Sequence, residues 1–310
     1  MLNKNAYKKG AIDILYFAYG SNLDEDRIKD RCPSAEKISE GELKGYKLGF
    51  QNNNRGKIVA NIIESPGDSV KGIIYRIPEE EDWRTLDHCE GHPHVYKRQI
   101  VNIIDKLNGR EIECITYIMG QSYGDGEKRK YGIPEIGYLR HILKGYEAMD
   151  TADIREVWDI FAGEEYGDYI SKIMDYISNN NKKEYILFFY GSLKRGFGNH
   201  RLMTDAVYLG PGVIEGYDMY SLRYFPAIVE GKGQVYGELY KVSEKELAAI
   251  DELEGYSPKD DIGMYVRRTT RVQTVIGMIA ADFYLWADES GSLRGRREYI
   301  SEGYWEGQKQ

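Results

Sequence analysis

The chain has 310 residues, of which 30% are charged and 42% hydrophobic, and 50 acidic against 42 basic residues give a net charge of −8. This length allows two domains with cores of their own. The acidic balance, without a basic tract, argues against a nucleic-acid partner. No run approaches the ~20 apolar residues of a membrane span, and no apolar stretch follows the basic N-terminus. We therefore expect a cytoplasmic protein with no membrane partner.

Cysteine usage agrees with that localisation. Cys32, Cys89 and Cys114 are widely spaced and odd in number. They predict reduced thiols rather than a disulfide framework.

The first half begins with an apolar run that ends at Tyr19 and meets the Gly20-Ser21 step, which predicts a buried strand opening into a loop. The following LDEDRIKDRCP predicts a short helix with Asp24 as its N-cap and Pro33 just past its end. Strand-like segments come next, at 37–43, 46–51, 58–63 and 70–77. Their short connections favour antiparallel pairing.

Helices and strands alternate in the rest of this half. Pro78 opens a predicted helix that runs to about Cys89. The later predicted elements are strands near 95–104 and 111–119, a polar loop at 120–132, and helices over 135–148 and 153–178. The polar loop either covers a site or only connects its neighbours. The Asn/Lys-rich stretch SNNNKKE then reads as a linker.

The second half repeats this order, starting with a strand at 185–190 and the step Gly191-Ser192. The segment KRGFGNH at 194–200 lacks the G-K-[ST] of a phosphate loop, so a solvated loop bordering a site is favoured. A helix is predicted from Ser243, where Ser243 and Glu246 can form a capping box. The remaining strands are expected near 207–220, 233–242, 265–275 and 279–287.

A glutamate at a helix end is the second repeated feature. Glu90 follows Trp83 and Leu86 at i, i+3 and i+7, and Glu254 follows Leu247 and Ile250 in the same way. A carboxylate on the buried side of a helix end is costly unless it is paired or used. Because the placement is duplicated, a functional role is favoured over simple capping.

Other chemistries fit these residues less well. Ser21 and Ser192 lie outside a G-x-S-x-G elbow, so turn-forming or ligand-binding hydroxyls are favoured over nucleophiles. A cysteine nucleophile at Cys89 has no counterpart in the second half, where Leu253 stands. Four possible metal ligands lie close together at His88, Cys89, His92 and His94, but their spacing fits no standard zinc pattern. We expect no metal and no cofactor.

FAYGSNL with LDHCEG in the first half, and FFYGSLKRG with IDELEG in the second, resemble the γ-glutamylcyclotransferase-like superfamily. The first half is similar to the classical γ-glutamylcyclotransferase branch, notably in PEIGYLRHILKGYEAM, and the second to the γ-glutamylamine cyclotransferase branch. The resemblance implies the α+β class, with two tandem domains that are each a small mixed, largely antiparallel β-barrel with flanking helices. We place domain 1 at 10–178, a linker at 179–184 and domain 2 at 185–310.

The resemblance also implies an activity, the cyclisation of a γ-glutamyl amine or γ-glutamyl amino acid to 5-oxoproline and the free amine. The substrate's α-amine would attack its own γ-carbonyl, with Glu90 and Glu254 as catalytic acid/base. Backbone amides of Gly20 to Leu23, and of Gly191 to Leu193, would hold the α-carboxylate or the developing oxyanion. The expected substrate-binding residues are Tyr19, Gly20, Ser21, Asn22, Leu23 and Tyr96 in domain 1, and Tyr190, Gly191, Ser192, Leu193 and Tyr265 in domain 2.

Three alternatives stay open. One domain could cyclise while the other binds a ligand or supports the fold, or the whole protein could be a small-molecule binding module. The same chemistry could also remove a γ-glutamyl protecting group from a larger amine. Retention of both glutamates favours two active sites. The expected partner is a small γ-glutamyl compound, and the sequence sets no oligomeric state.

Overall fold

The computed structural model describes residues 15–53, 55–122, 126–178, 184–287 and 297–307. These parts form two compact units, and each is described by itself. The first unit runs to Pro134 and resumes from Tyr138 to Ile160, and the second takes in 135–137 and everything from Phe161.

Residues 161–178 group with the second unit, whereas the sequence assigned them to domain 1. One physical reason is the hydrogen bond that Lys241 Nζ donates to the carbonyl of Tyr176, at 2.7 Å. The predicted linker lies almost wholly outside the described residues, since only Glu184 is described and it begins a strand. The limits of the two domains therefore stay a prediction.

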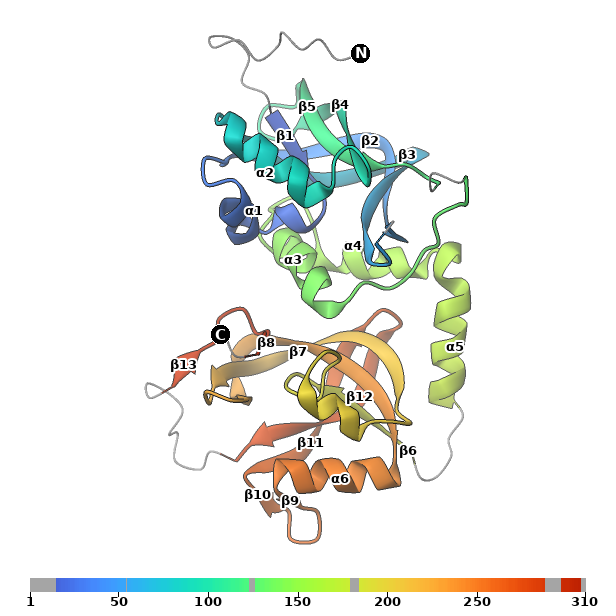
Figure 1. Cartoon of the computed structure of the whole chain (residues 1–310), viewed down its shortest axis with the longest axis vertical. Coiled ribbons are helices and arrows are strands. Elements are labelled where there is room, and N and C mark those ends of the chain that lie inside the picture. The colour runs from blue at the N-terminus through green and yellow to red at the C-terminus, as the bar shows by residue number, and fades with distance from the viewer. Residues whose placement is uncertain (1–14, 54, 123–125, 179–183, 288–296, 308–310) are drawn as a thin grey trace. The chain divides into compact units, whose positions relative to one another are not determined.

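A closed five-stranded barrel forms the first unit, in the order β1-β3-β2-β4-β5 (Figure 1). Its strands are β1 (Leu15–Ala18), β2 (Glu36–Asn52), β3 (Ile58–Arg76), β4 (Tyr96–Asp105) and β5 (Glu111–Met119). The apolar β1 pairs antiparallel with β3 and, where Tyr16 lies opposite Ile115, parallel with β5. The other pairs are antiparallel. The predicted mixed, largely antiparallel barrel is confirmed.

Short helices flank this barrel (Figure 1). They are η1 (Ser21–Leu23), α1 (Glu25–Arg31), α2 (Glu80–Glu90), α3 (Ile136–Glu147) and α4 (Ile154–Asp159). Asp24 caps α1 by accepting from the amide of Asp26, as predicted. The N-cap of α2 is Glu79, so Pro78 lies just before the helix rather than in its first turn.

The second unit repeats the barrel, with a six-stranded sheet in the order β11-β12-β6-β8-β7-β13. The first strand of this order, β11, also pairs antiparallel with β7, so the sheet curls round on itself. The pairing of β12 with β6 is parallel. Its strands are β6 (Glu184–Phe189), β7 (Val207–Ser221), β8 (Pro226–Ser243), β9 (Tyr256–Ser257), β10 (Ile262–Gly263), β11 (Tyr265–Thr274), β12 (Gly277–Trp286) and β13 (Glu298–Tyr299). Its helices are η2 (Ile160–Ala162), which begins at the division, η3 (Glu164–Tyr166), α5 (Gly167–Ser178), η4 (Gly198–Leu202) and α6 (Glu244–Glu254). The predicted capping box of Ser243 and Glu246 is present.

Some predicted boundaries are wrong, both in the long strands and in the helix predicted over 153–178. Segments expected as four strands form only β2 and β3, because residues 65–68 bulge opposite Gly45 while the ladder continues on both sides. In the same way β8 begins at Pro226, with residues 231–233 opposite Gly216. The single helix predicted over 153–178 is divided into four, with an extended backbone at Gly163.

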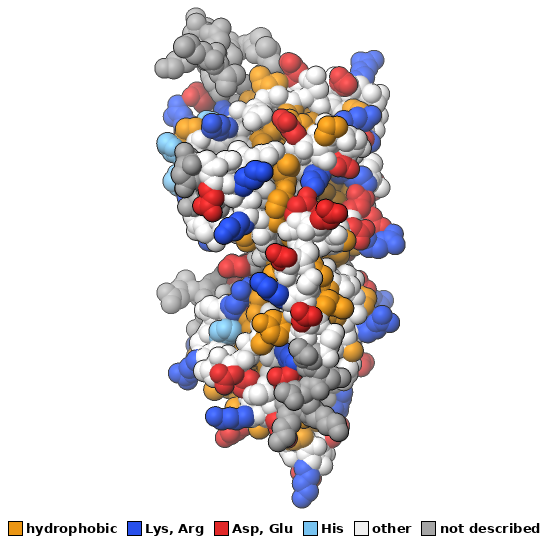
Figure 2. Space-filling model, turned by 90° about the vertical axis from the view of Figure 1, so that its right-hand side faces the viewer, with side chains coloured by type: hydrophobic (Ala, Val, Ile, Leu, Met, Phe, Trp, Pro, Cys, Tyr) orange, Lys and Arg blue, Asp and Glu red, His pale blue; other side chains and the backbone are white. Residues whose placement is uncertain are grey.

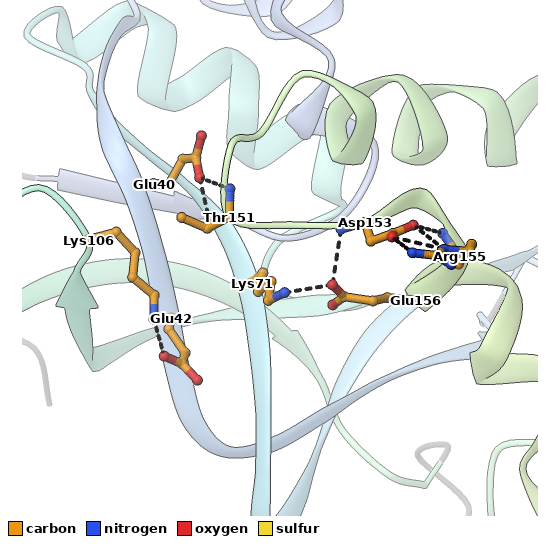
Figure 3. Close-up of polar contacts among 8 residues, drawn as sticks. All are labelled: Glu40, Glu42, Lys71, Lys106, Thr151, Asp153, Arg155 and Glu156. Atoms are coloured by element: carbon orange, nitrogen blue, oxygen red, sulfur yellow. Dashed lines mark hydrogen bonds and ion pairs between the residues drawn. The ribbon is translucent and has the colours of Figure 1, made fainter.

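A network of polar contacts fastens the segment before α4, and α4 itself, onto the first barrel (Figure 3). Glu40 of β2 accepts from the amide and hydroxyl of Thr151, at 2.9 and 2.6 Å. Lys71 of β3 reaches Glu156 of α4 at 2.6 Å, and the same Glu156 oxygen accepts from the amide of Asp153. These contacts hold residues 150–156 against β2 and β3.

The loop predicted at 120–132 is joined to β2 near its C-terminal end and is bridged within itself. Ser122 bridges Lys128, and Tyr131 bridges Gln51. Arg129 is buried and donates to the carbonyl of Gly120 at 2.5 Å. These described ends are therefore structured rather than a loose connection.

The surface carries both signs of charge. Figure 2 shows Lys and Arg side chains interspersed with Asp and Glu over the face in view. None of the helices in the described ranges has the length and apolar character needed to span a bilayer.

Close packing of α3 on η1 gives a first prediction. A Cβ on Gly145 would lie 2.2 Å from Leu23 Cβ and 3.0 Å from the carbonyl carbon of Leu23. Overpacking costs about 1–3 kcal/mol, which outweighs the gain of up to about 1 kcal/mol in helix propensity. We expect Gly145→Ala to lower the free energy of unfolding of the first unit by about 1–2 kcal/mol in urea titrations.

Gly167→Ala is the matched control, because a Cβ at this helical position meets nothing within 4 Å. Equal or greater stability of Gly145→Ala would contradict the packing argument.

Candidate active sites

Each candidate glutamate is the last residue of a helix that a left-handed glycine terminates. Glu90 ends α2 before Gly91 at φ 64°, and Glu254 ends α6 before Gly255 at φ 65°. Glycine adopts this conformation without the steric cost of a Cβ, so the helix stops at the glutamate. The apolar residues one and two turns earlier are buried. The carboxylate therefore stands at the edge of the buried helix face.

In the first unit, the Glu90 carboxylate is held by two polar side chains. Asn22 Nδ2 donates to Glu90 Oε1 at 3.1 Å, and Arg31 Nη1 lies 3.4 Å from the same oxygen. Arg31 also donates to Asn22 Oδ1 at 2.7 Å, and Asn22 Nδ2 donates to the Tyr16 hydroxyl at 2.9 Å. Burial raises the pKa of Glu90, and Arg31, Asn22 and Arg27 oppose that rise.

Tyrosines surround this carboxylate. Tyr96 donates to the carbonyl of Ala60 at 2.5 Å, and the Tyr138 hydroxyl accepts from the amide of Ala60 at 3.1 Å. Tyr19 donates to the carbonyl of Tyr117 at 2.5 Å. Burial is the main cause that raises the pKa of Tyr19 and Tyr96, and the nearby charge of Glu90 adds to it. Both tyrosines therefore keep their protons at neutral pH.

The second unit has a defined cavity of about 180 Å³ beside Glu254. Five residues expected to bind substrate line it, namely Tyr190, Gly191, Ser192, Leu193 and Tyr265. Such a volume is below that of a pocket for a drug-sized ligand and suits a small metabolite. Burial raises the pKa of Glu254 to about 7. Leu193 stands where the first unit has Asn22, so the carboxylate lacks the amide that holds Glu90.

Both Gly-Ser loops make the same tight turn. The amide of Leu23 donates to the carbonyl of Gly20 at 3.0 Å, and the amide of Lys194 donates to that of Gly191 at 3.2 Å. The Leu23 amide is thus engaged inside the turn, and its side chain packs against α3.

Sequence reasoning missed several residues that lie at these sites. Arg31 lies in α1 and Tyr138 in α3. The family resemblance of the segment PEIGYLRH, which contains Tyr138, was the sequence signal that could have identified this tyrosine. In the second unit the unassigned lining residues are Phe188, Phe189, Asn199, Phe225, Pro226, Leu253, Met264 and Tyr284. Asn199 donates to Ser192 Oγ at 2.8 Å.

The second loop is solvated in part. Arg195, Gly196 and Gly198 are exposed and Asn199 borders the cavity, in agreement with the prediction, but Lys194 is only 1% exposed. Its Nζ donates to the carbonyl of Trp305 at 2.8 Å and lies 3.6 Å from the centre of the Tyr304 ring. The charge is buried because an aromatic face and a carbonyl replace water.

Within the described ranges, no group of three or more His, Cys, Asp and Glu side chains is arranged to hold a metal ion. Cys89 is exposed, and His92 Nδ1 lies 3.3 Å from the carbonyl of Tyr96. The four possible ligands near the end of α2 do not form such a group.

The fold and its two glutamate sites define the class, a tandem of two small β-barrel domains that each carry a helix-terminal glutamate beside a Gly-Ser loop. The model of the family Gamma-glutamyl cyclotransferase, AIG2-like, matches residues 16–139 and 187–307. The chain belongs to this family, and is an enzyme of the γ-glutamylcyclotransferase type.

Named relatives and a solved structure are similar to this chain. Gamma-glutamylcyclotransferase of Homo sapiens is 37% identical over 176 residues, which are 54% of this chain and 88% of the relative. The gamma-glutamylcyclotransferase family protein YtfP of Escherichia coli (strain K12) is 43% identical over 67 residues, 22% of this chain and 59% of that protein. A solved gamma-glutamyl cyclotransferase structure aligns with 51% of this chain and 98% of its own, at 28% identity and TM-score 0.41.

The raised pKa of Glu254 predicts a pH-dependent stability. The unfolded side chain ionises near 4.5 and the folded one near 7. The contribution of this side chain to the free energy of unfolding is therefore fully present below pH 4.5 and is lost as the pH rises through 7. The loss is on the order of 3 kcal/mol. We expect Glu254→Gln to become more stable relative to wild type over this range, as measured by urea unfolding of the second unit.

Glu252→Gln, an exposed change on the same helix, serves as the control. A stability difference between Glu254→Gln and wild type that stays constant from pH 4 to 8 would count against the buried carboxylate.

Proposed function

We propose that each domain cyclises a γ-glutamyl compound to 5-oxoproline and releases the free amine, with Glu90 and Glu254 moving the protons. The observation that carries the proposal is the position of Glu254, which lines a small cavity together with the loop Gly191–Leu193. Its pKa is raised to about 7, which suits proton transfer near neutral pH. The membership of the family and the repeat of the same loop and glutamate in the first unit support it.

The chemistry asks little beyond positioning and proton transfer. The substrate's α-amine nitrogen forms a bond to its own γ-carbonyl carbon, and the bond from that carbon to the leaving nitrogen breaks. The glutamate takes a proton from the attacking amine and gives one to the leaving nitrogen, so it returns to its first state. Nucleophile and electrophile share one molecule, so folding the substrate provides much of the rate gain.

The loop amides are proposed to bind the negative charge of the substrate. Backbone N–H groups after a strand can converge on an anion, and one oxyanion donor is worth about 3–4 kcal/mol in other enzymes. In the first domain the tight turn leaves this role to Gly20, Ser21 and Asn22. In the second, Gly191, Ser192 and Leu193 would serve, with Tyr190 and Tyr265 lining the cavity.

We further propose that the two domains prefer different leaving groups. Arg31 contacts Glu90, and Arg27 is close enough to influence the pKa of Glu90. Guanidinium groups favour a leaving amino acid with its own carboxylate. In contrast, Leu253 and Met264 line the second cavity and are 37% and 45% exposed. An apolar rim favours a γ-glutamyl amine without a charge beside the amide.

The second candidate is a protein in which only one domain cyclises. It is favoured by the unequal state of the two carboxylates, because Arg31 and Asn22 occupy Glu90 Oε1 before any substrate arrives. A carboxylate held in this way is a weaker base toward the attacking amine. Under this reading domain 2 is the active domain and domain 1 binds a ligand.

Product release from matched variants tests the main proposal. We expect 5-oxoproline from a panel of γ-glutamyl dipeptides and γ-glutamyl alkylamines, measured by chromatography. Glu90→Gln should lose at least about 100-fold on the dipeptides, and Glu254→Gln a similar factor on the alkylamines, since general acid–base catalysis contributes about 10²–10⁴-fold.

The double variant Glu90→Gln/Glu254→Gln is expected to be inactive, and Glu252→Gln serves as the control with full activity. Full activity of the double variant would overturn the assignment of the glutamates. Loss of all activity in Glu254→Gln alone would favour the one-domain reading.

The pH profile of the second domain gives a separate prediction. In Glu90→Gln, kcat/KM on an alkylamine substrate should rise through pH 7 as Glu254 ionises and becomes a base. The α-amine of the substrate also titrates, and it does so in the same way in both variants. The difference between the profiles of the two single variants therefore reports the glutamates. Superimposable profiles would contradict distinct environments for Glu90 and Glu254.

A further inference from the structure

An aspartate lies one helical turn before each candidate glutamate, at the unfavourable end of the helix. Asp87 precedes Glu90 by three residues, and Asp251 precedes Glu254 in the same way. A helix C-terminus carries partial negative charge, so a carboxylate in its last turn is destabilising. The same costly residue at the same position in both domains calls for a compensating interaction in each.

In the first domain the compensation comes from β4 and β5. Arg98 Nε donates to Asp87 Oδ1 at 2.7 Å, and the Tyr117 hydroxyl donates to the same oxygen at 2.7 Å. Arg98 also donates to the carbonyl of Trp83 in α2 at 3.1 Å, and its guanidinium lies 4.7 Å from the centre of the Trp83 ring. The last two turns of α2 are thereby tied to the barrel.

The second domain builds the same cluster from the corresponding elements. Arg267 Nη1 lies 3.0 Å from both oxygens of Asp251, and the Tyr284 hydroxyl donates to Asp251 Oδ1 at 2.6 Å. Here the cluster is more deeply buried, with the Asp251 side chain 8% exposed against 28% for Asp87. Hydrogen bonds to a charged group in such surroundings are strong.

The tyrosine of each cluster also reaches the strand that carries the Gly-Ser loop. The carbonyl of Tyr117 accepts from the Tyr19 hydroxyl at 2.5 Å, and the carbonyl of Tyr284 accepts from the Tyr190 hydroxyl at 2.7 Å. Tyr19 and Tyr190 immediately precede Gly20 and Gly191. One residue therefore touches the glutamate helix with its hydroxyl and the loop strand with its carbonyl.

We infer that Asp87 and Asp251 are positioning residues, which with Tyr117 and Tyr284 fix the distance between the proton-transferring glutamate and the loop that holds the substrate. This inference rests on the proposed function. A substrate bound by the loop and a proton carried by the helix meet only if the two elements keep their spacing, and a misplacement of about 1 Å can cost 10²-fold in rate.

The test uses full-length chains in which the other domain is silenced. In the Glu254→Gln background, Asp87→Asn and Tyr117→Phe are measured singly and together on the dipeptide substrate. We expect each to lower kcat by about 10- to 100-fold with KM changed less than about 3-fold, because the loop still binds the substrate. The double variant should lose no more than about the larger single loss, since the two side chains act as a unit.

Asp251→Asn and Tyr284→Phe in the Glu90→Gln background repeat the test on the alkylamine substrate. Glu156→Gln is the control for a lost ion pair, because it removes the partner of Lys71 far along the sequence from the glutamate (Figure 3). It should leave kcat within about 2-fold.

Two results would overturn the inference. One is an unchanged kcat in both Asp→Asn variants, and the other is fully multiplicative losses in both double variants. If the silenced backgrounds themselves release no 5-oxoproline, the proposed function fails instead. Thermal melts of each variant against Glu156→Gln show whether a loss in kcat comes from unfolding.

Discussion

Burial of a carboxylate at the end of a helix is the constraint on which both halves of this protein depend. The apolar residues that seat α2 and α6 on their barrels carry Glu90 and Glu254 into low-dielectric surroundings. Removing such a group from water disfavours its charged form. The terminating glycines set where each helix ends, and in the first domain Asn22 and Arg31 offset that cost.

The two domains meet this constraint in different ways. Around Glu90, Asn22 and Arg31 supply hydrogen bonds and positive charge, whereas Glu254 faces a cavity whose loop has Leu193 at the equivalent position. The loops are also braced differently. The first packs on α3 through Leu23. In the second, the buried Glu238 accepts from the amide of Arg195 at 2.9 Å. The two domains thus share a geometry and differ in the electrostatics around their glutamates.

Local signals predicted the elements better than their ends. The cap at Asp24, the capping box at Ser243 and the period of the helix stripes depend on neighbours within one turn, so the sequence carries them directly. The sequence predicts that residues 65–68 separate two strands and that a later strand begins only near 233. In the structure residues 65–68 and 231–233 bulge inside β3 and β8, because pairing on both sides keeps each strand in its ladder.

The sequence by itself determined two repeated units, each with a Gly-Ser loop and a helix-terminal glutamate, because both features repeat at nearly constant spacing. The α+β class followed from the resemblance to a family. Only the tertiary structure decided what surrounds each carboxylate. Arg31 reaches Glu90 across 59 residues, and Tyr117 reaches Asp87 across 30. Such contacts follow from strand register and helix packing, which no local pattern encodes. The same reason explains why a lysine read as solvated, Lys194, is buried under the C-terminal segment.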